Sequence, residues 1–268
     1  MNKKIGFIGA GNMAKAMIGG IVKSSLVDAN KVTASDLNEN ALENAKKEYG
    51  INVTTDSKEV VKNSDIVVVA VKPNVYDIVL EGVKDLISDE KIIVTIAAGK
   101  TIESIENVIG KDKKVIRTMP NTPALVNEGM SAICKNKNIT DEELNIVKNI
   151  FNSFGKAEVV NEYLIDAVIG ASGSAPAYVF MFIEAMADAA VLAGMPRNQA
   201  YTFAAQAVMG SAKMVLETGK HPGELKDMVC SPGGTTIEAV KTLEEEGFRS
   251  AVIKAIGDCI EKSKEMSK

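Results

Sequence analysis

The sequence predicts an α/β protein in two parts, a doubly wound parallel sheet in residues 1–160 and an all-helical region in residues 161–268. Three observations support this fold class. Up to about residue 160, short β-branched runs alternate with amphipathic stretches, a pattern typical of alternating strands and helices. The strand signals then stop, and long Ala- and Met-rich helical stretches follow. The chain has 268 residues, 46% of them hydrophobic, which is enough apolar surface for a core in each part.

The predicted strands are short and lie in the first part of the chain. They are expected at 4–8, 32–35, 66–71, 92–97, 115–119 and 130–134. The run from Asp65 to Val71 is apolar without alternation, which indicates a central strand that helices cover on both faces. Because strands alternate with helices, a parallel sheet is expected.

The helical region is apolar on more than one side. Helices are predicted at 176–193, 197–218 and 235–246, and a last helix from about 248 has a Lys- and Glu-rich end that we expect to fray. The stretch 178–192 is apolar around most of the helix circumference, so packing on one side would leave apolar surface in water. The sequence therefore predicts a homodimer built on these helices.

The same stretch is not expected to span a membrane. Glu184 and Asp188 interrupt it on one helix face, and Pro and Gly residues bound it. These two carboxylates are interpreted as the solvent-exposed edge of the helix, with contact to a substrate as the alternative.

Composition narrows the partners and the compartment. The net charge is −4 with both signs spread along the chain, which is unlike the basic stripe of a nucleic-acid-binding protein. Cys134, Cys230 and Cys259 lie far apart without CxxC spacing, and the chain begins without an apolar signal segment. We therefore expect a cytoplasmic protein that binds neither nucleic acid nor membrane.

The first motif follows the first predicted strand at once. It reads Gly9-x-Gly11-x-x-Ala14 and leads into a helix. Gly9 permits the tight turn, Gly11 lets backbone approach a pyrophosphate, and Ala14 allows close helix packing. The motif alone is weak evidence for a dinucleotide site, but a predicted strand precedes it and a predicted helix follows it, which is the context that such a site requires. The interpretation is a Rossmann-type dinucleotide site, in preference to a structural glycine-rich turn or a methyltransferase-type nucleotide site.

The end of the second strand bears on the choice of dinucleotide. Asp36 could accept hydrogen bonds from the ribose hydroxyls of NAD and would repel a 2′-phosphate. Ser35 is a possible phosphate donor, and Asp36 could instead cap the next helix. The sequence leaves open both the choice between NAD and NADP and the role of Asp36 as ribose acceptor or helix cap.

Loops with glycine and proline follow three later strands, at 70–73, 97–99 and 119–123. Each alone could be ordinary turn chemistry. Together they fall at the carboxyl ends of strands, where an open α/β sheet binds its ligands.

The stretch 221–238 is the most informative part of the helical region. Residues 231–234, Ser-Pro-Gly-Gly, form a loop with free backbone amides, and Thr235-x-x-Glu238 is a capping-box pattern that opens a helix. Such a loop could bind a small carboxylate, or it could be a tight turn between helices. His221 is a lone histidine before Pro-Gly, a pattern that favours a structural role over that of a general acid. Cys230 is interpreted as a residue that fills space in the packing.

Over essentially its whole length the sequence resembles the pyrroline-5-carboxylate reductase family. The motifs that carry the resemblance stand in the family order and spacing, at residues 7–13, 70–73, 172–174, 176–178, 221–223, 225–227, 231–236 and 247–250. Two departures are visible. Ala175 stands where the family often has Gly, and Asp36-Leu37 replaces a polar or basic pair often linked to NADP.

The resemblance implies an enzyme of proline biosynthesis that transfers a hydride from NADPH or NADH to the C=N bond of 1-pyrroline-5-carboxylate, giving L-proline. It implies a dinucleotide-binding domain in 1–160, a dimerisation and substrate domain in 161–268, and a homodimer that assembles further, with a site shared between protomers. The implied cofactor-binding residues are Ile8, Gly9, Ala10, Gly11, Asn12, Met13, Ser35, Asp36, Ser57, Ala70, Val71, Lys72, Pro73, Ile96, Ala97, Ala98 and Asn121. The implied substrate-binding residues are Glu162, Ser231, Gly233, Gly234, Thr235 and Thr236, with the Thr236 hydroxyl as the catalytic group at the ring nitrogen.

The expected chemistry places few demands on the protein. A cyclic imine can take its proton from solvent, so no metal is needed, and the protein has to bring the imine carbon within roughly 3 to 3.5 Å of the nicotinamide. Two classes of alternative remain. One is a module that senses NAD(P) without turnover, and the other is a different imine reductase or a β-hydroxyacid dehydrogenase. The last would place a lysine on the first helix of its second domain, whereas residues 157–212 contain no lysine.

Overall fold

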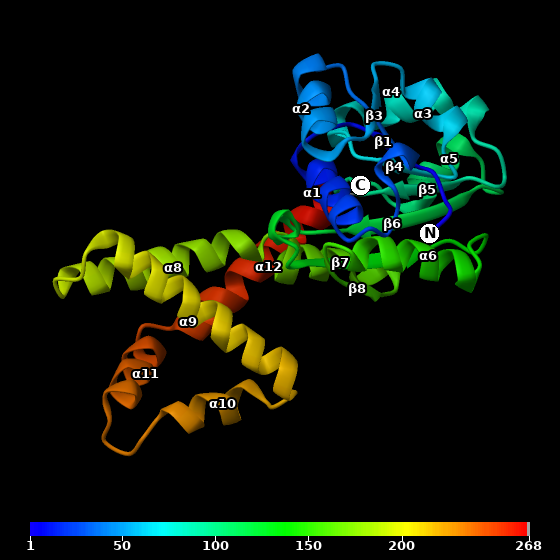
Figure 1. Ribbon diagram of the computed structural model, residues 1–268. Coiled ribbons are helices and arrows are strands. Elements are labelled where there is room, and N and C mark those ends of the chain that lie inside the picture. Colours follow the sequence, from blue (N-terminus) through cyan, green and yellow to red (C-terminus); the bar gives the residue numbers. More distant parts are fainter. Residues whose placement is uncertain (267–268) are drawn as a thin grey trace. The chain divides into compact units, whose positions relative to one another are not determined.

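The computed structural model of the protein describes residues 1–266, which divide by their contacts into two units (Figure 1). A sheet unit contains Met1–Ser174 and the chain end from Cys259, and a helical unit contains Ala175–Asp258. The sheet unit extends beyond residue 160 because Ile165 and its neighbours complete one of its apolar cores. The division of function at residue 160 stays a prediction.

A single sheet forms the centre of the sheet unit, with strand order β3-β2-β1-β4-β5-β6-β7-β8 among the described residues. The strands are β1 (Ile5–Ile8), β2 (Val32–Ser35), β3 (Asn52–Thr54), β4 (Ile66–Val69), β5 (Ile92–Thr95), β6 (Lys114–Met119), β7 (Gly129–Lys135) and β8 (Gly155–Val159). The six predicted strands are confirmed. All four residues of β4 are buried, as expected for a central strand.

The sheet differs from the prediction at both edges. The sequence does not predict β3 or β8, which are the edge strands, because exposed polar residues such as Asn52 and Lys156 interrupt any apolar run. The expectation of an all-parallel sheet is wrong at β7, which pairs antiparallel with β6. The two are joined by a short connection through the 3-10 helix Thr122–Val126, and a parallel pair would need a longer crossover.

Helices cover both faces of the sheet, which confirms the doubly wound fold (Figure 1). One face packs against α1 (Asn12–Lys23), α2 (Glu39–Tyr49) and α6 (Asp141–Asn152), and the other against α3 (Ser57–Asn63), α4 (Pro73–Val83) and α5 (Ile102–Ile109). Shorter helical segments are Ala29–Lys31, Lys84–Leu86, Glu162–Leu164, α7 (Ile165–Val168) and the π-helix Ile169–Gly173. The strand order reverses between β1 and β4, the switch point at which open α/β sheets bind ligands.

The helical unit contains α8 (Ala175–Leu192), α9 (Arg197–Thr218), α10 (Pro222–Val229), α11 (Thr235–Glu245) and the first part of α12 (Phe248–Met266). The sequence does not predict α10. The predicted capping box at Thr235 is wrong, because Gly234 is the N-cap of α11 and makes no side-chain cap. The predicted fraying is also wrong up to Met266, since Ser263 is buried and donates to Asp166 Oδ1 at 2.6 Å. Residues 267 and 268 lie outside the described part.

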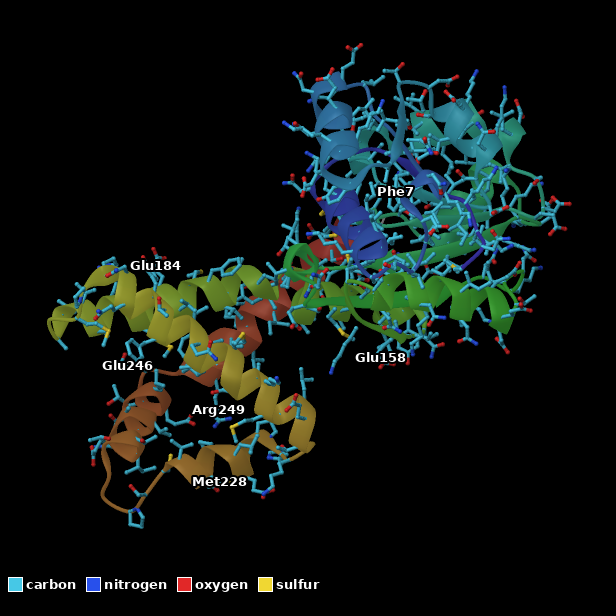
Figure 2. The ribbon with its side chains drawn as sticks, in the orientation of Figure 1. Phe7, Glu158, Glu184, Met228, Glu246 and Arg249 are labelled. Atoms are coloured by element: carbon cyan, nitrogen blue, oxygen red, sulfur yellow. The ribbon has the colours of Figure 1, made fainter. Side chains whose placement is uncertain are left out.

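The helical unit buries very little of its apolar surface. Its buried core among the described residues consists of Ala187, Ala200 and Ala204. Large side chains remain exposed, among them Phe180 at 64% and Met228 on α10 (Figure 2). The segment Glu162–Leu192 is long and apolar enough to cross a membrane, but helices of soluble proteins pass the same test. Exposed apolar helix surfaces of this kind are typical of protein–protein interfaces.

Candidate active site

The glycine-rich turn lies between β1 and α1 at the switch point. Gly9 has φ +105°, and a Cβ there would lie 2.6 Å from the Ala70 carbonyl oxygen, so only glycine fits. Gly11 is the N-cap of α1 and has open space around it, with no atom within 4 Å of a Cβ built on it. An anion can therefore approach the first amides of α1. These observations fit a bound pyrophosphate.

Asp36 lies against this turn. Its Oδ2 accepts from the Ala10 amide at 2.7 Å and its Oδ1 from the Asn38 amide at 2.9 Å. The alternative that Asp36 caps the next helix is wrong, because Asn38 is the N-cap of α2 and accepts from the Ala41 amide. The carboxylate is thus held at the position where a Rossmann domain contacts the adenosine ribose.

Ser35 is directed into the protein. Its side chain is buried, and its hydroxyl lies 3.4 Å from the Phe7 carbonyl oxygen and 3.3 Å from Ser57 Oγ. The expectation that Ser35 donates to a 2′-phosphate is therefore not supported by the geometry. Its carbonyl accepts from the Gly9 amide at 2.7 Å, which helps to hold the glycine-rich turn. Ser57 begins α3 and is half-buried.

Two further loops reach the same edge of the sheet. Residues 70–73 follow β4, with Lys72 exposed as the N-cap of α4 and Pro73 in its first turn. Residues 96–98 follow β5, where the Ala97 amide donates to Thr95 Oγ1 at 3.2 Å. The predicted cofactor residues therefore gather at the carboxyl ends of β1, β2, β4 and β5.

Asn121 follows β6 at this edge and makes structural bonds. Its Nδ2 lies 3.2 Å from the carbonyl oxygen of Ser172, and its Oδ1 accepts from the Met130 amide at 2.8 Å. Both ends of the side-chain amide are thus used within the protein. This bonding favours a role for Asn121 in holding the loop, and direct contact with the cofactor stays a prediction.

Glu162 forms an ion pair with a buried arginine, a contact that the sequence does not predict. Its Oε1 accepts from Arg117 Nη1 at 2.8 Å and from the Ile102 amide at 2.8 Å. Arg117 lies on β6 and is 3% exposed, whereas the Glu162 side chain keeps 32% of its surface exposed. The one available signal in the sequence was a charged residue, Arg117, inside the predicted strand 115–119.

The predicted carboxylate loop lies in the helical unit between α10 and α11. The Gly234 amide donates to the Ser231 carbonyl at 3.0 Å, and Gly233 has φ +66°, so the loop forms a tight turn. The first amides of α11, from Thr235 onward, have no partner within the helix because of their position in its first turn. Ser231 is exposed and Thr236 is half-buried. The arrangement combines a turn with a helix N-terminus that favours a negative group.

His221 has a structural role. It is the N-cap of α10, and its Nδ1 accepts from the Gly223 amide at 3.0 Å. This bond supports the structural interpretation. Asp188 is exposed and forms an ion pair with Arg197, and Glu184 is also exposed (Figure 2).

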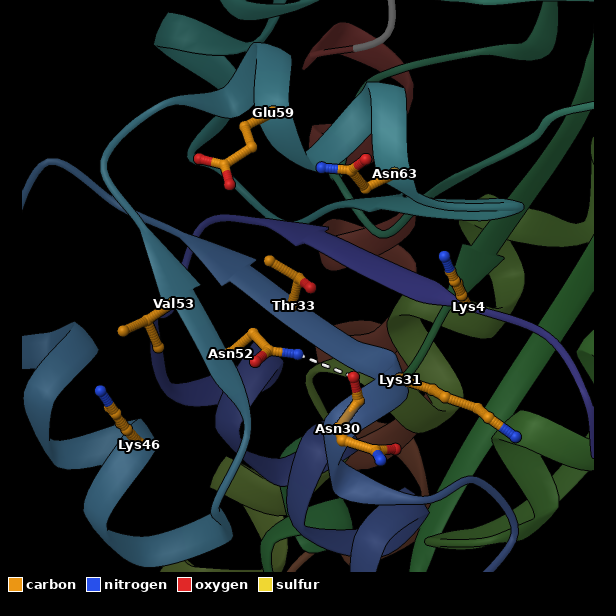
Figure 3. Close-up of a pocket in the computed structure, with 9 residues that line it drawn as sticks. All are labelled: Lys4, Asn30, Lys31, Thr33, Lys46, Asn52, Val53, Glu59 and Asn63. Carbon is orange, nitrogen blue, oxygen red and sulfur yellow. Dashed lines mark hydrogen bonds between the residues drawn. The ribbon is translucent and has the colours of Figure 1, made fainter.

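A hollow of about 380 Å³ lies elsewhere, beside α3 and the first residues of β2 and β3 (Figure 3). Its lining includes Lys4, Lys46 and Glu59. Lys4 precedes β1, so the hollow opens toward the amino end of the sheet, opposite the predicted cofactor edge. None of the predicted site residues lines it, so the hollow is not a candidate active site.

Comparison with known proteins gives two family matches. Residues 162–266 match the family described as pyrroline-5-carboxylate reductase dimerisation. Residues 4–99 match the family described as NADP oxidoreductase, coenzyme F420-dependent. The first match supports the predicted homodimer, and the second supports a nicotinamide cofactor.

Full-length relatives are also found. The chain is 55% identical over 268 residues to the pyrroline-5-carboxylate reductase of Escherichia coli strain K12, covering 100% of both chains. It superimposes on the structure of a pyrroline-5-carboxylate reductase from Coxiella burnetii with a TM-score of 0.94, at 34% identity and with 100% of both chains covered. A Plasmodium falciparum pyrroline carboxylate reductase with NADP bound gives a TM-score of 0.90 at 34% identity, covering 100% of this chain and 99% of that one.

Proposed function

This chain belongs to the pyrroline-5-carboxylate reductase family. From that membership we propose which of its residues bind the cofactor and which bind the substrate. The protein is a nicotinamide-dependent oxidoreductase that reduces the C=N bond of 1-pyrroline-5-carboxylate to give L-proline. The observation that carries the assignment of residues is the pairing, in one chain, of an open glycine-rich turn with an amide-rich turn at the start of α11.

The dinucleotide binds at the carboxyl edge of the sheet and supplies the hydride when bound. The turn at residues 8–13 receives the pyrophosphate, and residues 70–73 and 96–98 line the nicotinamide side. Gly9 and Gly11 support this placement, since the first allows the turn and the second leaves room for a phosphate.

NADH is the preferred cofactor in this proposal. The Asp36 carboxylate is held by the Ala10 amide and would accept bonds from the ribose hydroxyls, while a 2′-phosphate would meet its negative charge. Residues 36–40 carry two carboxylates and no basic side chain. A family member has been solved with NADP bound, so the preference depends on this chain's own residues.

The substrate carboxylate binds at residues 231–236. The turn amides and the N-terminus of α11 attract a negative group, and the Thr236 hydroxyl then bonds to the ring nitrogen. That nitrogen takes its proton from solvent. Glu162, with a partly exposed carboxylate, lies on the substrate side of the site in this proposal.

The homodimer assembles further into a larger oligomer in the cytoplasm. Support comes from the exposed apolar side chains of the helical unit, which need more cover than one chain provides. The free thiols of Cys134, Cys230 and Cys259 are in keeping with a reducing compartment.

The test follows oxidation of NADH and of NADPH at matched concentrations with pyrroline-5-carboxylate, and the reverse reaction with a β-hydroxyacid as a control. We expect saturable, imine-dependent oxidation with a higher kcat/KM for NADH. Reduction of NAD+ or NADP+ by the hydroxyacid without any imine-dependent oxidation of NADH or NADPH would refute the residue assignments, as would dinucleotide binding without turnover.

Asp36 has its own variants. Asp36→Asn keeps an acceptor for the Ala10 amide and removes the charge, so the NADPH to NADH ratio of kcat/KM should rise about 10-fold or more. Asp36→Ala should shift the ratio in the same direction. Glu39→Gln removes a nearby exposed charge and is the matched control, with an unchanged ratio. An Asp36→Asn ratio equal to that of the wild type would refute the ribose contact.

A further inference from the structure

We infer that Arg117 is a positioning residue of the cofactor site, acting through Glu162 on the loop that joins β5 to α5 (residues 96–101). The role of Arg117 rests on the proposed function, since residues 96–98 of this loop are proposed to line the nicotinamide. Neither residue is adjacent to the loop in sequence. The fold brings Arg117 from β6 and Glu162 from the segment before α7 to its far end.

One carboxylate oxygen connects the three elements. Glu162 Oε1 accepts from Arg117 Nη1 and from the Ile102 amide, each at 2.8 Å. Ile102 is the first residue of α5 and directly follows the loop. The guanidinium on β6 therefore helps to place the carboxylate, and the carboxylate holds the first amide of α5, whose N-cap is Thr101.

The pair lies in a poorly solvated part of the sheet unit. Arg117 is 3% exposed, and Glu162 is the one protein acceptor that it has among the described residues, since its Nε and Nη2 have none. Cys134 is directly opposite Arg117 across the β6–β7 ladder. Burial, and secondarily the Glu162 charge, raises the pKa of the Cys134 thiol to about 11, while Arg117 lowers it. Removing the Glu162 carboxylate would leave the buried guanidinium charge without compensation, and removing Arg117 would leave the carboxylate with the Ile102 amide as its donor.

The loop is held at its two ends, and within it Lys100 pairs with Asp77 on α4 at 2.8 Å. At the β5 end, the Ala97 amide donates to Thr95 Oγ1 at 3.2 Å. At the α5 end, the Ile102 amide donates to Glu162. Between them, Gly99 has φ +76°, and a Cβ built on it would lie 2.8 Å from the Met266 carbonyl oxygen, so the backbone passes close to the end of α12. Ile96 and Ala98 are only half-buried. Release of the α5 end should therefore move the residues at the nicotinamide.

The same strand provides a matched control. Lys114, at the opposite end of β6, pairs with Glu143 on α6 at 2.7 Å, and both side chains are mostly buried. Lys114 lies at the amino end of the sheet, away from the proposed cofactor edge. Arg117→Met and Lys114→Met each remove one partner of an ion pair from β6, but only the first should affect the cofactor.

The experiment uses the full-length enzyme and measures the Kd of NADH by fluorescence, the KM values for NADH and for the imine, and the melting temperature. Arg117→Met should raise the Kd and KM for NADH about 10-fold or more, because small displacements at a binding loop are costly. The KM for the imine should rise as well, because Glu162 is proposed to lie on the substrate side of the site. Arg117→Lys should recover part of the affinity, since an ammonium can still donate to Glu162. Lys114→Met should lower the melting temperature and leave the NADH constants unchanged.

Three results would decide against the inference. Equal melting losses in Arg117→Met and Lys114→Met with an unchanged Kd of NADH would make the pair merely structural, and a lack of recovery in Arg117→Lys would exclude the ion pair as the cause. If Arg117→Met does not fold, Glu162→Gln decides, because it keeps an acceptor for the Ile102 amide and weakens the pair, and an unchanged Kd would overturn the role. A wild-type enzyme that binds neither NADH nor NADPH would instead refute the proposed function itself.

Discussion

Gly9 and Gly11 belong to one motif, yet the structure predicts opposite consequences for alanine at the two positions. Gly9 has φ +105°, and a Cβ there would lie 2.6 Å from the Ala70 carbonyl oxygen and 3.3 Å from Val71 Cγ1. Gly11 has φ −72°, and a Cβ there would meet no protein atom within 4 Å. Gly9→Ala should therefore damage the fold, and Gly11→Ala should damage the binding of the dinucleotide.

The magnitudes follow from these geometries. A non-glycine residue at such a φ costs about 1–3 kcal/mol of unfolding free energy, and an enforced contact in a packed site costs about 1–3 kcal/mol more. With about 2–4 °C per kcal/mol for a unit of this size, Gly9→Ala should lower the melting temperature by about 5–20 °C. Gly11→Ala exchanges an N-cap glycine for alanine in an allowed conformation, which costs about 1 kcal/mol or less.

Thermal melting and fluorescence titration with NADH separate the two effects. We expect Gly11→Ala to melt within about 4 °C of the wild type and to bind NADH at least about 10-fold more weakly, because its methyl group occupies the space for the pyrophosphate. A Gly9→Ala protein with wild-type stability would contradict the close approach of the turn to Ala70. A Gly11→Ala protein with wild-type affinity would contradict the placement of the pyrophosphate.

Three further predictions concern the reaction, the pH dependence and the dimer. Thr236→Ala should lower kcat about 10-fold or more through loss of the hydroxyl at the ring nitrogen, while the Kd of NADH stays constant; an unchanged kcat would exclude that role. Burial raises the pKa of the Tyr76 phenol, and a smaller effect of the Thr95 hydroxyl lowers it. Above about pH 10 the unfolded chain therefore loses the phenol proton while the folded chain keeps it. The free energy of unfolding then falls by up to about 1.4 kcal/mol per pH unit. Tyr76→Phe should flatten this alkaline slope in urea unfolding between about pH 9 and 11, and a slope equal to that of the wild type would count against it. Phe180→Lys places a charge on an exposed apolar helix, so sedimentation should show dissociation to monomers, and an intact dimer would remove Phe180 from the interface.

Much of the fold could be predicted because neighbouring residues encode it. The buried strands β1, β4 and β5 are mostly apolar, and loops with glycine or proline follow their carboxyl ends. The turn at Gly9 could be identified from sequence since its requirement for glycine is local. The dimer could be predicted because α8 is apolar around most of its circumference, a property of the helix by itself.

The tertiary structure decided which polar groups meet. Ser35 and Asp36 are adjacent in sequence, but strand alternation turns the hydroxyl of Ser35 inward while Asp36 lies against the glycine-rich turn. Arg117 and Glu162 are separated by 45 residues, and neither has a pattern that announces the other. Apolar periodicity reports only which side of an element is buried. The partner of a buried charge depends on strand order and register, which arise from packing the whole sheet. For that reason the ion pair at the end of the loop between β5 and α5 could be found only in three dimensions.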